Sequence, residues 1–344
     1  MINFGFWKNL KKPIMVLAPM ADVTDCAFRK IINKYGKPDV FWTEFVSADG
    51  LAHPDARAKL LIDLKFEKGE HPIVAQIFGS NPDNIREAAR LCRELGFDGV
   101  DINMGCPDRS IEKQGAGAAM IKNPKLAREI IRAAKEGAGD LPVSVKTRIG
   151  YNKNEINTWL RELLEEDIPV LTVHLRTRKE MSLVPAHWDL MRDVVALRNE
   201  MGKETLILGN GDAIDIPDAQ IKVWDSGCDG VMLGRAIFGN PWLFSREGSN
   251  FSERQVGDSE RSEAKNTTFS ANDKITARLN VMIEHTKTFE ELLGGVKNFA
   301  IMKKHYKAYV NGFDGAKELR MKLMEAENAT EVEKITNDFL DKIW

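Results

Sequence analysis

The sequence lacks the features that identify several large classes of protein. No apolar run approaches the roughly 18 residues that a membrane-spanning helix needs, so we expect no membrane association. Residues 1–13 hold no long apolar core and no cleavage-like end, so we expect no signal peptide. The cysteines form no Cys-x-x-Cys pair and have no histidine at metal-ligand spacing; they are Cys26, Cys92, Cys106 and Cys228. We therefore expect a cytoplasmic protein with neither a disulfide framework nor a bound metal.

An excess of charge of one sign is also missing. Lysine and arginine number 49 against 51 aspartate and glutamate residues, which gives a net charge of −2. This balance excludes a polycation, so any surface that binds nucleic acid must be a local patch. The glycine pattern G-x-G-x-x-G is absent after the first predicted strand, which argues against a dinucleotide-binding open sheet. The length of 344 residues leaves room for one large domain and a small one.

The sequence does contain an alternation of short apolar runs with amphipathic helical patterns. Most runs are continuously apolar, as expected of parallel strands that are buried on both faces. Two of the intervening helices have clear start signals, Asn81-Pro82 and Asn123-Pro124, with asparagine at the N-cap and proline behind it. Eight such repeats predict a (β/α)8 TIM barrel of the α/β class. The predicted strands are 14–18, 40–43, 73–78, 99–102, 143–146, 170–174, 206–208 and 230–233.

The composition changes after residue 244. Residues 245–273 are rich in Ser, Glu, Arg, Asn and Gly and poor in large apolar residues, so we interpret them as a flexible low-complexity linker. From Lys274 onward four helical patterns follow one another, and the last starts with a predicted capping box of Thr330 with Glu333. We therefore predict a barrel domain at 1–244, a linker at 245–273 and an all-α helical-bundle domain at 274–344.

Polar residues end nearly every apolar run of the predicted barrel. In TIM barrels the active site lies at the carboxyl ends of the strands, so these residues are the candidates for function. A purely structural barrel gives no reason for such a pattern. In chain order the residues are Ala18-Pro19-Met20, Glu44, Gln76, Asn103 with Cys106, Lys146 with Arg148, His174 with Arg176, Asn210-Gly211-Asp212 and Gly234-Arg235.

Several of these side chains suit a bound ring that accepts electrons. Lys146 supplies a cation that stabilises an anionic cofactor or an electron-rich carbonyl, although a plain surface lysine is the alternative. Gln76 offers both a donor and an acceptor to the edge of a flavin or a pyrimidine. His174 is compatible with a ligand role or with a buried core histidine. The glycines of the last two strand-end loops predict a phosphate site, with Arg235 adding charge-assisted hydrogen bonds.

Cys106 is the one cysteine in a loop, where it stands between Gly105 and Pro107. The other cysteines fall in predicted helices or turns, and we interpret them as structural. A thiol exposed in such a loop serves either as a nucleophile or as a proton donor. No histidine follows it at short range, but His174 can approach across the barrel mouth. The residue pattern therefore leaves both roles open.

Taken together, segments from most of the chain resemble the tRNA-dihydrouridine synthases. Only residues 245–273 fall outside this resemblance. Two features depart from the usual family pattern: Leu175 replaces a small residue, and residues 179–188 lack a tyrosine-glycine pair. The matching segments are 16–25 (VLAPMADVTD), 103–107 (NMGCP) with 115–117 (GAG), 144–148 (SVKTR), 173–177 (VHLRT), 210–212 (NGD), 232–235 (MLGR) and 303–306 (KKHY) with Gly312 and Leu319-Arg320.

The resemblance implies an FMN-dependent oxidoreductase that uses NADPH to reduce the C5–C6 bond of particular uridines in tRNA. Hydride would pass from flavin N5 to uridine C6, and Cys106 would donate a proton to C5. The target base would have to leave its stack to reach the barrel mouth. The implied substrate contacts are Asn103, Arg148, Arg176, Lys303, Lys304 and Arg320. The implied flavin contacts are Ala18, Pro19, Met20, Gln76, Lys146, His174, Asn210, Gly211, Asp212, Gly234 and Arg235.

The predicted helical tail carries a local excess of positive charge. Between Lys297 and Lys322, seven basic residues stand against two acidic ones, a net of +5. Such a patch suits contact with RNA phosphates, and a solvated helix face is the ordinary alternative. Two other functions remain open: a flavin barrel that reduces a free pyrimidine or small enone, and an RNA-binding module without catalysis. A small substrate needs no basic tail, and a non-catalytic module needs no cation at the barrel mouth.

Overall fold

The computed structural model describes residues 2–245 and 270–343. The chain forms two compact units. The first contains Met1–Cys26 and Pro38–Arg235, and the second contains Ala27–Lys37 and Ala236–Trp344. The helix that follows the first strand thus belongs to the second unit, together with the C-terminal helices. Most of the predicted linker at 245–273 lies outside the described residues.

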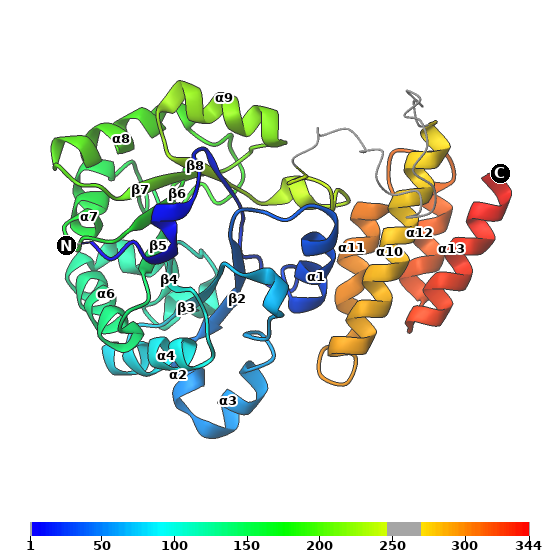
Figure 1. Ribbon diagram of the computed structural model, residues 1–344, viewed down its shortest axis with the longest axis horizontal. Coiled ribbons are helices and arrows are strands. Elements are labelled where there is room, and N and C mark those ends of the chain that lie inside the picture. The colour runs from blue at the N-terminus through cyan, green and yellow to red at the C-terminus, as the bar shows by residue number, and fades with distance from the viewer. Residues whose placement is uncertain (1, 246–269, 344) are drawn as a thin grey trace. The chain divides into compact units, whose positions relative to one another are not determined.

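Eight parallel strands form the sheet of the first unit (Figure 1). They pair in the order β1-β8-β7-β6-β5-β4-β3-β2, and a parallel bridge joins Val16 to Val40. This bridge connects the two ends of that order, so the sheet closes on itself and the predicted (β/α)8 barrel is confirmed. The strands are β1 (Ile14–Leu17), β2 (Phe41–Ser47), β3 (Ile73–Phe78), β4 (Gly99–Met104), β5 (Val143–Arg148), β6 (Val170–His174), β7 (Leu206–Asn210) and β8 (Gly230–Leu233).

Several strands extend beyond the apolar runs that predicted them. β5 ends at Arg148 instead of Lys146, and β7 ends at Asn210 instead of Leu208. The apolar pattern stops earlier because the last residues of these strands face a polar barrel mouth, while the backbone ladder continues. Side chains on a strand point alternately to its two faces, so the polar residues at these ends have directions fixed by rigid backbone.

The helices of the first unit lie outside the sheet (Figure 1). Asn81 and Asn123 cap α4 and α6 as predicted, since their side chains accept hydrogen bonds from backbone N–H groups of the first helical turn. Proline follows each cap, where its missing N–H costs nothing. The helices are α2 (Ala48–Ala52), α3 (Pro54–Leu60), α4 (Pro82–Glu94), α5 (Arg109–Lys113), α6 (Pro124–Ala138), α7 (Arg161–Leu164), α8 (Met191–Glu200) and α9 (Ile216–Ser226).

The amino ends of the strands are closed by an N-terminal segment that the sequence patterns did not single out. Trp7 is 2% exposed and packs in one apolar cluster with Ile14, Val40 and Val170, which lie near the starts of their strands. Each Å² of apolar surface that such packing removes from water stabilises the folded protein by about 25 cal/mol. Because apolar side chains fill this end of the barrel, a polar site has room only at the carboxyl ends.

The second unit is an all-α bundle with two histidines in its core. Phe28 packs against the rings of His285 and His305, with centroid distances of 5.3 and 5.0 Å. Both histidines are buried, so His305 in the 303–306 segment is a core residue. The helices are α1 (Cys26–Tyr35), α10 (Ala271–Leu293), α11 (Met302–Tyr309), α12 (Ala316–Glu325) and α13 (Ala329–Ile343).

The start of α13 differs from the prediction. The helix begins at Ala329, and the side chain of Asn328 accepts a hydrogen bond from the N–H of Glu331 at 2.9 Å. The predicted capping box of Thr330 with Glu333 is therefore wrong, because the better N-cap residue Asn328 stands two positions earlier. Within residues 2–245 and 270–343, no helix is long and apolar enough to cross a membrane.

Candidate active site

A cavity of about 290 Å³ opens at the carboxyl ends of the barrel strands. Its volume is close to the lower end of the usual range for ligand pockets. Every residue that the sequence singled out in the barrel for the cofactor, the uracil or the proton transfer lines it. These residues are Ala18, Pro19, Met20, Gln76, Asn103, Cys106, Lys146, Arg148, His174, Arg176, Asn210, Gly211, Asp212, Gly234 and Arg235.

The register of the strands places several of these polar side chains directly beside one another on adjacent strands. Asn103 pairs with Lys146, Arg148 pairs with His174, and His174 pairs with Asn210. Residues paired in this way on neighbouring strands point to the same face of a sheet. Lys146 also reaches across the barrel mouth, where its Nζ donates to Asn210 Oδ1 at 3.1 Å. Residues far apart in sequence therefore form one continuous polar wall.

The cavity carries more positive than negative charge. Asp212 is the one carboxylate among its lining residues, against four cations. Burial, with a contribution from the neighbouring Arg148, lowers the pKa of Lys146 to about 8. Burial and the surrounding cations also lower the pKa of His174 well below its usual value, so its imidazole is neutral. A bound anion would relieve this repulsion and restore the charge of Lys146. The lining cations are Lys146, Arg148, Arg176 and Arg235.

The loop that carries Cys106 is held by contacts from both sides. Asn103 Oδ1 accepts hydrogen bonds from the N–H groups of Gly105 at 3.1 Å and Cys106 at 2.9 Å. The carbonyl oxygen of Cys106 accepts the N–H of Ala118 at 2.9 Å. Gly117 has a φ of +59°, and a Cβ there would lie 2.7 Å from that carbonyl oxygen. The Gly-Ala-Gly turn therefore supports the cysteine loop through a close approach that only glycine allows.

The Cys106 thiol is half-buried beside an apolar cluster that includes Phe78 and Ile111. Burial raises the pKa of the thiol, despite the opposing effect of nearby Arg148, so it is protonated at neutral pH. The neutral His174 has its Nε2 3.2 Å from the guanidinium of Arg176. Of the two roles that the sequence left open for Cys106, these observations favour the proton donor over the nucleophilic thiolate.

The predicted phosphate loops meet at Asp212. Its carboxylate forms ion pairs with Arg176 and with Arg235, the latter at 2.5 Å. Burial acts to raise the pKa of this carboxyl, but hydrogen bonds from Arg176 and from the backbone of Ala186 keep it below its usual value. Gly211 has a φ of +126°, and a Cβ there would lie 2.8 Å from the Cβ of Ala186. Asp212 thus fixes the two arginines, and the glycine lets the loops pack closely.

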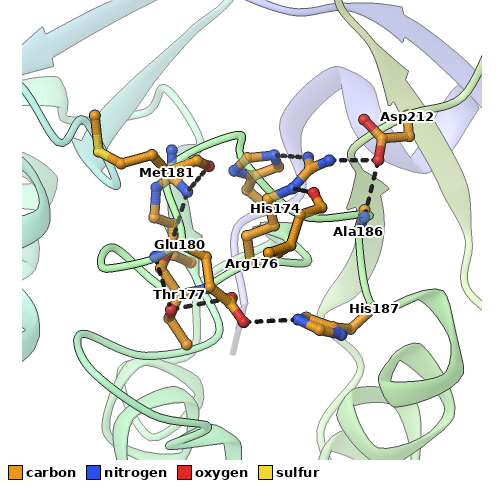
Figure 2. A network of polar contacts seen from close by, with 10 residues as sticks. His174, Arg176, Thr177, Glu180, Met181, Ala186, His187 and Asp212 are labelled. Atoms are coloured by element: carbon orange, nitrogen blue, oxygen red, sulfur yellow. Dashed lines mark hydrogen bonds and ion pairs between the residues drawn. The ribbon is translucent and has the colours of Figure 1, made fainter.

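Residues 177–187 form a segment after β6 that is tied down by hydrogen bonds (Figure 2). Arg176 is 2% exposed, and its Nε donates to the carbonyl of Val184 at 2.6 Å. Glu180 accepts the N–H of Thr177 at 2.7 Å and contacts His187 Nε2 at 2.9 Å. These contacts hold residues 177–187 in place, although the segment lacks the tyrosine-glycine pair that the resemblance led us to expect.

Arg148 links this segment to the cysteine loop. Its Nη1 donates to the carbonyls of Thr177 at 3.1 Å and Met181 at 2.9 Å, and its Nε donates to the carbonyl of Gly105 at 2.8 Å. Arg148 and Arg176 were predicted to contact the substrate. The structure gives both guanidinium groups protein partners, so they also support the cavity wall; contact with the substrate stays a prediction.

Sequence reasoning missed several residues of the site. Phe45, Ser182 and Met232 line the cavity, and Asp101 lies beneath it with 1% exposure. Phe45 follows the polar residue Glu44 on β2, where the apolar run had already ended. Glu44 itself accepts the N–H of Asp22 at 2.5 Å and lies outside the cavity lining. Asp101 lies on β4 two residues before Asn103, and only the pairing of β4 with its neighbouring strands shows its partners, Gln76 and Ser144.

The predicted substrate contacts of the tail lie in the helical unit. A groove of about 410 Å³ has three basic residues in its lining, and only Arg320 among them was predicted. Arg320 Nη1 donates to the carbonyl of Val310 at 2.6 Å. Lys303 and Lys304, the other predicted contacts, are on α11 outside the groove lining. The groove is lined by Lys307, Asn311, Lys317, Arg320, Met321 and Met324.

The fold and the site together define an α/β-barrel protein with a cation-lined cavity at the carboxyl ends of its strands. The sequence profile of the dihydrouridine synthase family matches residues 16–343. The chain therefore belongs to the dihydrouridine synthase family. This confirms the predicted family and the predicted class, an oxidoreductase of the dihydrouridine synthase type.

Individual relatives agree with this assignment. The chain is 41% identical over 339 residues to a protein named probable tRNA-dihydrouridine synthase 2 from Bacillus subtilis, covering 97% of this chain and 96% of that protein. It is 38% identical over 336 residues to a probable tRNA-dihydrouridine synthase from Staphylococcus aureus strain Mu50, covering 97% and 95%. A solved structure of morphinone reductase matches 67% of this chain and 84% of its own, with a TM-score of 0.47 and 14% identity.

Proposed function

We propose that this chain is a tRNA-dihydrouridine synthase that reduces the C5–C6 bond of particular uridines in tRNA, with bound FMN and with NADPH as reductant. The observation that carries the proposal is the half-buried thiol of Cys106 in the wall of a cation-lined cavity. The names of the relatives from B. subtilis and S. aureus support tRNA as the substrate. When bound, the flavin supplies the hydride that the uracil ring accepts.

The cavity residues fit an anionic cofactor such as FMN. Four cations against one carboxylate leave an electrostatic excess that a phosphate and an electron-rich ring would neutralise. A Cβ built on Gly234 would lie 3.7 Å from the Cβ of Ala18 and 3.9 Å from the Sδ of Met20, so this loop lies in contact distance of the turn at 18–20 beside Arg235. We assign the ring to Lys146, Gln76, His174 and the turn at 18–20, and the phosphate to the loops at 210–212 and 234–235.

The substrate's uracil would lie against the loop of Cys106. The thiol donates its proton to C5, which completes the addition of hydrogen across the double bond after hydride arrives at C6. Asn103 holds the loop and borders the cavity, so it is placed to contact the ring as well. Lys146 stabilises negative charge that develops in the cavity. Each of these groups acts from a strand or from a loop pinned to a strand.

The basic groove of the helical unit supports a large polyanionic substrate. Lys307, Lys317 and Arg320 line it, and no acidic side chain is among its lining residues. A free pyrimidine or a small enone would have no use for such a surface. RNA phosphates are bound by this combination of lysine and arginine, with little regard to sequence.

One purification tests the function. The protein is expected to be yellow and to retain FMN through gel filtration. NADPH oxidation should then depend on unmodified tRNA, and the tRNA should gain dihydrouridine, while free uridine should support little turnover. A colourless protein that takes up no FMN would refute the proposal. A yellow protein that reduces free uridine as well as tRNA would favour the small-molecule reductase.

The affinity for FMN is expected to fall as the pH rises above about 8. The pKa of Lys146 in the empty cavity is about 8, so the side chain loses its charge above that pH and the anion is held less firmly. Linkage limits the fall to about tenfold per pH unit. Titration of the apoprotein with FMN between pH 7 and 9.5 measures it. In Lys146→Met the affinity should be lower at pH 7 and lose this pH dependence; a pH-independent wild type would contradict the assignment.

The double substitution Lys307→Glu with Lys317→Glu is expected to weaken tRNA binding by one to two orders of magnitude at low salt. It should also reduce the slope of log affinity against log salt by about 0.7 to 1 per lost phosphate contact. The FMN content should not change. Lys334→Glu, on α13, is the matched control and should have little effect, because exposed ion pairs such as Lys334 with Asp338 contribute little. Equal losses in both proteins would indicate a general charge effect without a specific groove.

A further inference from the structure

A chain of buried hydrogen bonds runs beneath the cavity to the loop of Cys106. Its first member is Asp101, which the strand register pairs with Gln76 on one side and with Ser144 on the other. Asp101 Oδ1 accepts the hydroxyl of Ser144 at 2.5 Å, and Oδ2 accepts Gln76 Nε2 at 2.6 Å. Gln76 Oε1 then accepts Asn103 Nδ2 at 2.9 Å. Asn103 Oδ1 accepts the N–H of Cys106.

The direction of each amide in this chain follows from the carboxylate at its start. The two ends of an amide have nearly the same shape, so hydrogen-bond partners decide which end faces which way. Burial raises the pKa of Asp101 to about 6, which leaves it ionised and able only to accept at neutral pH. It therefore selects the nitrogen end of Gln76, and the oxygen end is left to face Asn103. Asn103 must then present its nitrogen to Gln76 and its oxygen to the cysteine loop.

We infer that Asp101 is a positioning residue whose carboxylate orients the amides of Gln76 and Asn103 and thereby holds the loop of Cys106. The inference rests on the proposed function, in which Gln76 contacts the cofactor and Cys106 donates the proton. A reversed Gln76 would place its nitrogen against the nitrogen of Asn103. That arrangement leaves buried groups without partners, at about 1–3 kcal/mol each, and releases the hydrogen bond to the loop.

An electrostatic role for Asp101 is the competing explanation, because its charge also acts on Lys146. The substitution Asp101→Asn distinguishes the orienting role from the electrostatic role. It removes the charge, but its amide oxygen can still accept from Gln76 if its nitrogen donates to the hydroxyl oxygen of Ser144 and that hydroxyl donates to the carbonyl of Val100. Asp101→Asn alone should therefore preserve the orientation. Ser144→Ala alone should preserve it as well, since the carboxylate still accepts from Gln76. The two changes combined leave the asparagine amide free to turn over.

The test is a double-mutant cycle on the flavin-loaded protein, with Asp101→Leu as the variant that removes the acceptor altogether. The first measurement is the alkylation rate of Cys106 by iodoacetamide without tRNA; the other three cysteines are buried. The second is kcat for dihydrouridine formation at saturating tRNA. Asp101→Leu and the combined variant release the loop of Cys106, so the alkylation rate should rise and kcat should fall. Each change should be about tenfold or more, the equivalent of one mismatched buried hydrogen bond. The two single variants should stay within about threefold of wild type.

Two results would overturn the inference. An Asp101→Asn protein as impaired as Asp101→Leu would assign the effect to charge, and additive single effects would remove the orientation argument. Flavin content and thermal unfolding of each variant show whether it is folded and loaded, and the soluble Asp101→Asn series remains decisive if Asp101→Leu fails to fold. If wild type itself forms no dihydrouridine, the proposed function fails, while the alkylation rates still test the orientation of the loop.

Discussion

Replacing Cys106 by alanine is expected to lower the rate of dihydrouridine formation by about two to four orders of magnitude, the usual contribution of a positioned general acid. In the proposed reaction the thiol, which lines the cavity, is the proton donor, and its raised pKa keeps it protonated across the neutral range. Its side chain is small and half-buried, so FMN content and tRNA affinity should stay close to wild type. Single-turnover measurements with the reduced, tRNA-saturated enzyme isolate the step that should be affected.

Two companion variants sharpen this prediction. Cys106→Ser keeps the shape but replaces the thiol with a much weaker acid, so it should remain slow. Cys92→Ala, a change at a fully buried cysteine of α4, is the matched control and should leave turnover within about threefold. Wild-type turnover should show no loss from cysteine ionisation until the pH passes the raised pKa of Cys106. Unchanged turnover in Cys106→Ala would remove the assignment of the proton donor.

The barrel could be predicted from sequence because each strand is buried on both faces. Continuous apolar runs signal such strands directly, and β3, β6 and β8 have the predicted bounds. The runs do not show which core a helix joins. The helix after β1 carries Phe28, which packs against His285 and His305 of the second unit. Its apolar face is the same for either destination, so the sequence pattern is silent on the choice.

The candidate site was predictable to the extent that its residues end strands. Polar residues at the ends of apolar runs identified the wall of the cavity, because the barrel brings all such ends to one face. The partners of those residues were not predictable. Arg148 and Arg176 appear in sequence as free cations, and only the structure shows them bound to carbonyls of residues 177–187. Lys307 and Lys317 come together with Arg320 only when α11 and α12 pack.

Mild acid is expected to destabilise the helical unit strongly. His285 and His305 are buried, and the Nε2 of each has no hydrogen-bond partner within the described residues. Burial lowers the pKa of His305 to about 3 and that of His285 well below its usual value. An unfolded chain binds a proton at each site below about pH 6.5, and the folded chain does not. The free energy of unfolding of the helical unit is therefore at its full value above pH 6.5 and falls as the pH decreases below it.

The size of this loss of stability follows from proton linkage. Two histidines that take up protons only on unfolding remove about 2.7 kcal/mol per pH unit, until the folded pKa values are reached. Hydrogen exchange of α10 and α11 between pH 7.5 and 4.5 measures the effect above the range where most carboxylates titrate. His305→Phe should halve the pH slope, whereas His53→Phe, at an exposed histidine ahead of α3, should leave it unchanged. Exchange that stays constant across this range would show that the buried pair is hydrated or already protonated in the folded protein. The expected slope follows because a bundle built around two buried neutral imidazoles, each with an Nε2 that has no partner within the described residues, takes up protons only by opening.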